Sequence, residues 1–161
     1  MPDLLTHLMI AQGCRKLGNG CSLTSCFLIG TVLPDLLVRP FHIMWPSLFW
    51  FVMPLHTPVG LLLVCAFTSQ FFRPQRRRLV FYNLLGGAAL HLFLDLFQKH
   101  IKSGYLWFFP FSWSTPEIGL IWPETSLYLL PVWSGIGVFY LARWFVGRRV
   151  VLKQLPLGAG K

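Results

Sequence analysis

The feature that most constrains the fold is an apolar run of 20 residues, LVFYNLLGGAALHLFLDLFQ, from Leu79 to Gln98. About 20 apolar residues in a helix span the hydrocarbon core of a bilayer, so the run predicts a membrane-spanning helix. It contains one imidazole and one carboxylate, His91 and Asp95, which a helix places on one face, one turn apart. Asn83 and Gly87 extend this stripe at the same spacing, and we expect the stripe to face the protein interior. Taken alone, the pair is explained equally well by a buried hydrogen bond or by a metal ion.

The composition of the 161-residue chain agrees with a membrane location. Hydrophobic residues make up 55% of it, aromatic residues 16% and charged residues 12%, whereas soluble domains carry roughly 25% charged residues. The mean hydropathy is +0.59. These values predict an integral membrane protein in contact with membrane lipid, with aromatic side chains at the membrane surfaces.

The formal net charge of +9 raises the question of a nucleic-acid partner. The basic residues lie in short clusters between apolar stretches, however, and form neither an amphipathic basic helix nor a recognition motif. Membrane topology explains clusters in these positions. The sequence therefore indicates no nucleic-acid binding.

Prolines, glycines and charged turns divide the rest of the chain into segments. Thr57 and Pro58 are typical of a helix start, with threonine as the N-cap and proline at the first helical position. Pro34-Asp35 and Arg73-Pro74 are expected to end apolar helices. We expect helices at 3–13, 22–33, 58–72, 79–98 and 126–146, a turn at 14–21, interfacial segments at 36–55, and an interfacial loop at 100–125.

The predicted fold is all-α: a multi-pass transmembrane helical bundle with about three to five membrane-embedded helices and interfacial loops. The first two runs are shorter than a span, so we expect a hairpin that is tilted, partly inserted or packed inside the bundle. Residues 1–150 are expected to form a single domain, followed by a basic cytoplasmic tail at 151–161.

The charges sort between the two ends of this bundle. If successive helical runs alternate in direction, all five histidines and all five acids fall at one end. Eleven of the fourteen basic residues fall at the other end, which the positive-inside rule assigns to the cytoplasm together with the C-terminus. These eleven are Arg15, Lys16, Arg73, Arg76, Arg77, Arg78, Arg143, Arg148, Arg149, Lys153 and Lys161. The sorting predicts one polar site at the extracytoplasmic end.

Burying an ionisable side chain within the membrane costs free energy, and such side chains usually have a function. His7, Asp35 and His56 fall at the same end as His91 and Asp95. Five such side chains at one end favour a metal site over an isolated hydrogen-bonded pair. Imidazoles and carboxylates together suit Zn²⁺, and Mn²⁺ is the alternative where carboxylates dominate.

The remaining polar residues at this end have two interpretations each. His42, among prolines and tryptophans, is typical of an interfacial side chain, and Glu117 and Glu124 are helix-start residues or additional ligands. The three bases at this end are candidates to hold a phosphate, or else they extend to the membrane surface as interfacial cations. These bases are Arg39, Lys99 and Lys102.

Five short motifs follow one another over about residues 1–125. They are Met1-Pro2-Asp3 with Thr6-His7, Gly30 with Leu33-Pro34-Asp35, His56-Thr57-Pro58, His91 with Leu94-Asp95, and Phe108-Phe109-Pro110-Phe111. In this order they resemble the bacterial membrane-bound metal-dependent hydrolases, an inner-membrane family that is distantly similar to zinc-dependent phospholipase C. The chain departs from that pattern at Gln98-Lys99-His100, where a threonine and a glycine are more usual.

The resemblance implies a metal-dependent hydrolase of the inner membrane that acts on phosphoesters or phospholipid-like substrates through a metal-activated water. One or two divalent ions would be held, and Asp35 and Asp95 would be catalytic residues that orient or deprotonate the water. The alternative is a non-enzymatic helical membrane protein, such as a scaffold, a partner-binding subunit or a small transporter, whose polar or metal cluster is structural. The metal ligands implied by the resemblance are His7, Asp35, His56, His91 and Asp95, with His100 as an addition.

Overall fold

The computed structural model describes residues 4–17, 23–99, 104–122 and 125–154. These residues form helices and loops, without a strand beyond an isolated bridge between Gln98 and Ile121. The predicted all-α class is confirmed. The helices are α1 (Leu4–Leu17), α2 (Thr24–Met44), α3 (Phe49–Val52), α4 (Pro58–Ser69), α5 (Pro74–Leu96) and α6 (Thr125–Gln154), with two short 3-10 helices, η1 (Pro46–Leu48) and η2 (Met53–His56).

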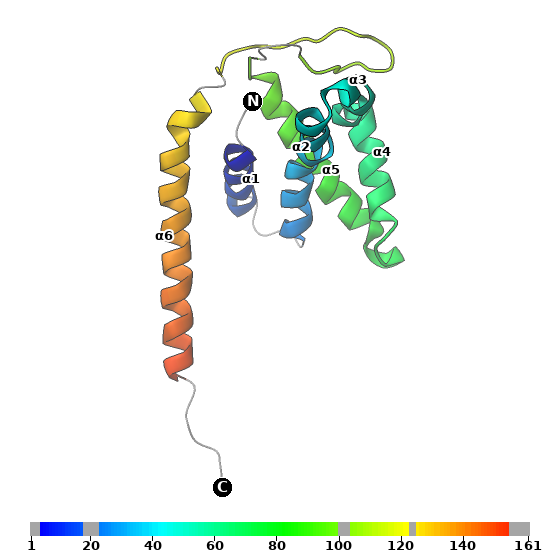
Figure 1. Ribbon diagram of the computed structural model, residues 1–161. Coiled ribbons are helices and arrows are strands. Elements are labelled where there is room, and N and C mark those ends of the chain that lie inside the picture. The colour runs from blue at the N-terminus through cyan, green and yellow to red at the C-terminus, as the bar shows by residue number, and fades with distance from the viewer. Residues whose placement is uncertain (1–3, 18–22, 100–103, 123–124, 155–161) are drawn as a thin grey trace.

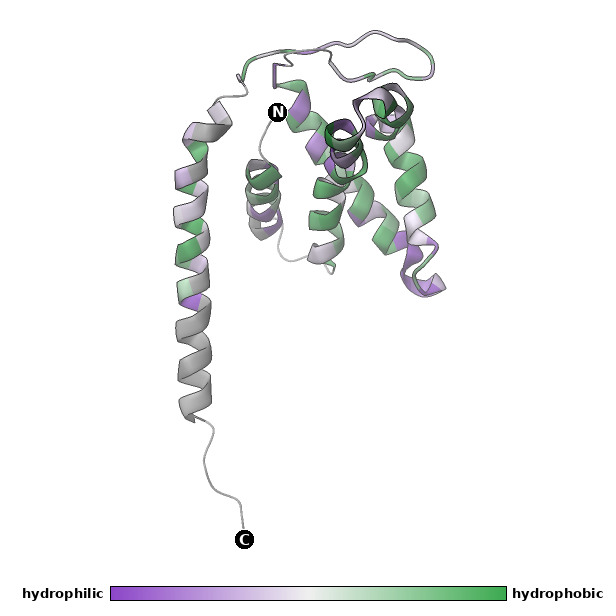
Figure 2. Ribbon diagram, in the orientation of Figure 1, coloured by the Kyte–Doolittle hydropathy of each residue, from purple (hydrophilic) through white to green (hydrophobic). Residues whose placement is uncertain are grey.

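Among the described residues, two helices, α2 and α5, are long and apolar enough to cross a membrane. A third crossing is counted if Pro46–His56 and Pro58–Ser69 form one broken span, which is bent by 77°. With the broken span counted, the three crossings equal the lower end of the predicted three to five membrane-embedded helices. Figure 2 shows hydrophobic residues over most of α2, α4 and α5, with hydrophilic residues gathered at the α4–α5 turn. The outward side chains are apolar, as with Ile29, Leu36 and Ile43 on α2, which are 55%, 62% and 78% exposed. Such faces suit contact with lipid.

The helices alternate in direction, so the segments that carry the predicted ligands meet at one end (Figure 1). The starts of α1, α4 and α6 lie there with the ends of α2 and α5, beneath the loop that leads to α6. The basic α4–α5 turn lies at the opposite end. Helix α6 stands beside α1, to which Trp133 Nε1 donates a hydrogen bond at Thr6 Oγ1 (3.1 Å). The predicted separation of acids and histidines from the basic clusters agrees with this arrangement, and the assignment of either end to the cytoplasm stays a prediction.

Glycines allow the closest helix approach, between α2 and α5. A Cβ added to Gly87 of α5 would lie 2.1 Å from the carbonyl oxygen of Phe27, and one added to Gly30 of α2 would lie 2.2 Å from that of Leu84. Small residues permit such backbone contact between membrane helices. The crossing lies about one turn before the predicted ligands on each helix and brings Asp35 opposite His91.

Two clusters of buried apolar residues support this arrangement. The larger lies between α2, α4 and α5, and the smaller lies between η2 and the loop after α5. The larger consists of Cys26, Leu61, Cys65, Val80, Leu84, Ala88 and Leu92, and the smaller of Met53, Tyr105 and Leu106.

Four predicted helix bounds are wrong. Helix α5 begins at Pro74, five residues before the predicted start at Leu79, so that the basic residues predicted to form a turn lie in its first turn. Helix α2 does not stop at Pro34-Asp35 but continues through Pro34 and Pro40 to Met44. A proline removes one helical hydrogen bond, yet in a membrane helix neighbouring segments and small local adjustments satisfy the freed backbone groups. Helix α1 passes Gly13, because one glycine costs a helix only about 1 kcal/mol, and α6 likewise passes Gly147 and ends at Gln154.

Candidate metal centre

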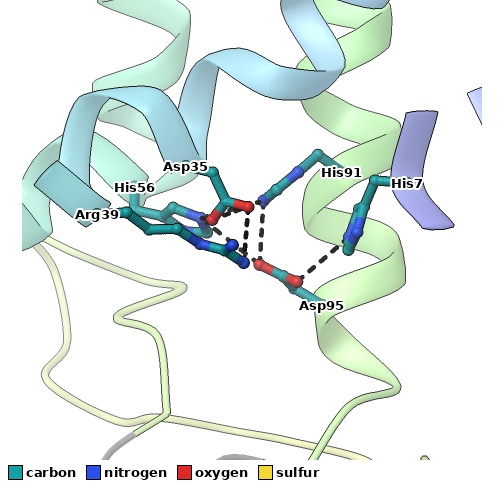
Figure 3. A network of polar contacts seen from close by, with 6 residues as sticks. All are labelled: His7, Asp35, Arg39, His56, His91 and Asp95. Carbon is teal, nitrogen blue, oxygen red and sulfur yellow. Dashed lines mark hydrogen bonds and ion pairs between the residues drawn. The ribbon is translucent and has the colours of Figure 1, made fainter. Parts of the chain in front are cut away.

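Four segments deliver five polar side chains to one place near the ends of α2 and α5 (Figure 3). None of the five is more than 3% exposed. In an apolar surrounding, such groups need each other or a ligand, because burying an unpaired charge or hydrogen-bonding group is costly. They are His7 from α1, Asp35 from α2, His56 from η2, and His91 and Asp95 from α5.

Helix α5 contributes the stripe that the sequence predicted. Asn83, Gly87, His91 and Asp95 are all buried, which confirms that this face points inward. The last two side chains meet one turn apart, with His91 Nε2 3.2 Å from Asp95 Oδ2.

His56 is held by a tight corner between η2 and α4. Thr57 Oγ1 accepts a hydrogen bond from the Gly60 backbone N–H (3.1 Å) and donates one to the Pro54 carbonyl (2.7 Å). The predicted Thr57 N-cap with Pro58 at the first helical position is thereby confirmed. A Cβ added to Gly60 would lie 2.0 Å from the Pro54 oxygen, so this corner requires glycine. The corner points the His56 ring toward α5.

Three ligand atoms form a nearly regular triangle. His56 Nε2 lies 3.2 Å from His91 Nε2 and 3.5 Å from Asp95 Oδ2, and the third side, from His91 Nε2 to Asp95 Oδ2, is 3.2 Å. A tetrahedral Zn²⁺ site with bonds of about 2.0–2.1 Å separates its ligand atoms by about 3.3 Å. Asp35 Oδ1 lies 3.9 Å and 3.8 Å from the two imidazole nitrogens and is the next carboxylate oxygen available to an ion at this position.

His7 extends the same cluster. Its Nε2 lies 3.4 Å from Asp95 Oδ1, and its ring centroid lies 4.4 Å from that of His91. The groups His7–His91–Asp95 and Asp35–His56–His91 each offer three ligand atoms within 4.8 Å of one another. Because His91 belongs to both groups, they make one centre.

The donor set fits a divalent cation. Both carboxylate oxygens of Asp95 are buried, and the imidazole nitrogens of His7, His56 and His91 lie 3.2–3.5 Å from them. Buried carboxylate oxygens in that state carry a large desolvation cost that a cation removes. Imidazole nitrogens and carboxylate oxygens are ligands that zinc accepts.

Arg39, a predicted phosphate-binding residue, pairs with one of the predicted ligands. Its Nη2 lies 2.8 Å from Asp35 Oδ2, one helical turn away on α2. Asp35 therefore presents Oδ2 to the guanidinium and Oδ1 to the imidazoles. Arg39 is 26% exposed, so it lies between the buried centre and the outside.

The other predicted residues lie outside this cluster. Lys99 is exposed, and its Nζ lies 4.1 Å above the Trp122 ring, which is a cation–π contact typical of a membrane surface. His42 packs against the Phe49 ring with centroids 4.8 Å apart, in keeping with the interfacial interpretation. Glu117 is exposed in the loop, and the predictions for His100, Lys102 and Glu124 concern residues outside the described ranges.

Tyr105 is a neighbour of the cluster that the sequence did not identify. It is 7% exposed, and its ring stacks on His56 with centroids 3.9 Å apart and an interplanar angle of 15°. Burial, and next the negative charges of Asp95 and Asp35, raise the pKa of the Tyr105 hydroxyl well above its ordinary value, so the hydroxyl stays neutral. In an aromatic-rich loop without periodicity, no sequence signal distinguishes this tyrosine from its neighbours.

A family model described as YdjM inner membrane protein matches residues 3–157. No curated protein and no solved structure gives a significant match. The family description and the apolar helices support the inner-membrane location that the resemblance implied, and they carry no statement about hydrolysis or about phospholipase C. With almost the whole chain matched, the protein belongs to the YdjM inner membrane protein family.

Proposed function

We propose that the protein is a metal-dependent hydrolase of phosphoesters, embedded in the inner membrane. The observation that carries the proposal is the triangle of His56 Nε2, His91 Nε2 and Asp95 Oδ2, with sides of 3.2–3.5 Å. Three inward-facing donors with a neighbouring carboxylate are the usual composition of a catalytic zinc site. A purely structural hydrogen-bonded pair would not require ligands from four segments.

The ion would be held by His56, His91 and Asp95, with Asp35 and His7 at the edge of the same cluster. A bound Zn²⁺ or Mn²⁺ would supply Lewis-acid polarisation of a phosphoryl oxygen and would make water a nucleophile at neutral pH. The buried setting of these side chains excludes bulk water and strengthens electrostatic interactions within the centre.

The two carboxylates are the candidates for proton handling. Asp35 is the better placed of the two, because its Oδ2 is fixed by Arg39 while its Oδ1 is directed toward His56 and His91. A carboxylate held in this way orients a water or accepts its proton. A guanidinium carries five N–H donors, so the Arg39–Asp35 pair is compatible with simultaneous contact between Arg39 and a phosphate.

The surroundings of the centre support a lipid phosphoester as substrate. Large apolar side chains are exposed at the end of α2, on α3 and on the loop after α5, and these elements lie at the same end of the molecule as the centre (Figure 1). Aromatic side chains in this position anchor a protein at the membrane surface, where lipid head groups lie. They include Trp45, Trp50, Phe51, Phe111 and Trp113, which are 50–89% exposed.

The test is metal analysis of the purified protein together with hydrolysis of a chromogenic phosphodiester. Wild-type protein should hold stoichiometric transition metal, should hydrolyse the substrate with Zn²⁺ or Mn²⁺, and should lose activity with a chelator and regain it when metal is added back. His91→Ala and Asp95→Ala should lose both metal and activity, whereas His42→Ala, a histidine outside the cluster, should lose neither. Wild-type protein without bound metal would remove the physical basis of the proposal.

The second candidate is a structural polar cluster in a scaffold, a partner-binding subunit or a small transporter. The Asp35–Arg39 ion pair favours it, because an acid paired with an arginine helps to hold a helix bundle together without taking part in a reaction. A protein that is metal-loaded but inactive toward phosphoesters with every metal tried would support this candidate instead.

A further inference from the structure

The loop after α5 places one aromatic ring directly on a proposed ligand. The Tyr105 ring lies nearly parallel to the His56 imidazole, at a centroid distance of 3.9 Å. On another side, the same imidazole meets His91 edge to face, with centroids 5.2 Å apart. The plane of His56 is thus defined by two rings, one from α5 and one from the loop.

The loop that carries Tyr105 is fixed to the helices at both ends. At its start, Tyr105 and Leu106 are buried with Met53 of η2. At its end, the Lys99 N–H donates to the Ile121 carbonyl (2.9 Å), and the Ile121 N–H donates to the Phe97 carbonyl (3.0 Å). Tyr105 therefore occupies a defined position over the centre.

An imidazole that binds metal through one nitrogen usually has its orientation set by a hydrogen bond at the other nitrogen. In this protein His56 Nε2 faces the cluster, while Nδ1 is buried without a hydrogen bond to another of the residues described. The ring is held at this position by packing. The side chain that packs on its face is Tyr105.

We propose that Tyr105 is a positioning residue of the metal centre, whose stacked ring fixes the His56 imidazole with Nε2 directed at His91 and Asp95. The inference rests on the proposed metal-binding function and adds a role for the loop. Docking of the loop and retention of the ion depend on each other, because both require the same orientation of His56.

The experiment compares zinc affinity, measured by competition with a chromogenic chelator, in three variants of the full-length protein in detergent. Tyr105→Leu removes the flat ring and should weaken zinc binding by about 10-fold or more, the usual cost of losing a residue that orients a ligand. Tyr105→Phe keeps the ring and removes only the hydroxyl, which hydrogen-bonds with Asp95, so it should lose much less affinity than Tyr105→Leu. Leu106→Ala, the matched control, removes a buried side chain from the same loop and cluster but keeps the ring, and should also lose much less affinity than Tyr105→Leu.

A second readout is the visible spectrum of the Co²⁺-loaded protein, which reports ligand geometry. It should change strongly in Tyr105→Leu and much less in Tyr105→Phe or Leu106→Ala. If Tyr105→Leu does not fold, Tyr105→Met, which fills the space without a ring, takes its place with the same expectation. Unchanged affinity in the ringless variant, or equal losses in Tyr105→Phe or Leu106→Ala, would overturn the role of the ring. Wild-type protein that binds no zinc would instead contradict the proposed function itself.

Discussion

At the scale of single residues, the two acids of the cluster are held differently. Asp95 lies against three imidazoles, those of His7, His56 and His91, whereas Asp35 places one oxygen on the Arg39 guanidinium. The guanidinium carries a permanent positive charge, which offsets part of the cost of burying the Asp35 carboxylate.

Replacing Arg39 should therefore affect stability as well as function. Arg39→Ala leaves the Asp35 carboxylate buried without its guanidinium and should lower the free energy of unfolding by about 1–3 kcal/mol. Reversible unfolding in mixed micelles measures this loss. When Asp35→Asn is already present, adding Arg39→Ala should lower the free energy of unfolding much less than it does in the wild type, because the two residues form one interacting pair. Additive losses in this double-mutant cycle would contradict the pairing.

The residues of the cluster were largely predictable, and their neighbours were not. His91, Asp95, His7, Asp35 and His56 stand out in the sequence because ionisable groups in apolar runs are rare. The pairing of Arg39 with Asp35 depends on a helix that continues past Pro34, and the position of Tyr105 depends on a loop that folds back over the helices. Neither of these features produces a periodic pattern in the sequence.

At the scale of elements, the packing of α2 on α5 sets the dimensions of the centre. Asp35 and the α5 ligands are brought together by a crossing at which Gly30 and Gly87 leave room for the opposite backbone. Any side chain at the crossing separates the two helices and hence the ligand atoms that they carry.

A pair of adjacent glycines in α5 tests this dependence. An alanine Cβ at Gly87 would lie 2.1 Å from a backbone oxygen of α2, whereas one at Gly86 would lie 3.4 Å from the Phe27 ring. Gly86→Ala should be neutral or raise stability by up to about 1 kcal/mol, since alanine favours the helix. Gly87→Ala should lower both the melting temperature and the zinc affinity. Equal behaviour of the two variants in thermal unfolding and chelator competition would show that the crossing does not determine the site.

The helices themselves were predictable to different degrees. Helix α5 follows from its apolar run, and the start of α4 follows from the Thr57 cap with Pro58. The length of α2 did not follow, because Pro34 and Pro40 are strong helix breakers in water but weaker ones among packed membrane segments.

At the scale of the whole molecule, the charges lie at opposite ends of the bundle. The α4–α5 turn and the basic start of α5 lie at the opposite end of the bundle from the starts of α1 and α4 (Figure 1), and the positive-inside rule assigns the basic end to the cytoplasm. A reporter that folds only outside the cytoplasm should thus be inactive when it is fused to the C-terminus of the full chain. The same reporter should be active when it is fused directly after Trp113 in a truncated chain. Activity of the C-terminal fusion would invert the orientation.

A bound ion should also stabilise the whole fold, since the ligands come from four segments. At a free zinc concentration 100 times Kd, the free energy of unfolding should rise by about 2.7 kcal/mol. Chelation should therefore lower the melting temperature of the wild type, and it should leave that of His91→Ala unchanged. A melting temperature of wild-type protein that does not respond to chelator and zinc would argue against a metal centre that joins these helices.

The two acids of the centre share one further property, which bears on biosynthesis. Asp35 has Arg39 one turn away on α2, and Asp95 has His91 one turn away on α5. A lone carboxylate in the middle of an inserting helix costs about 2.5–3.5 kcal/mol. We therefore expect each of these helices to insert with its acid already beside a partner on the same helix, and the four-segment cluster to form afterwards, when the helices associate in the bilayer.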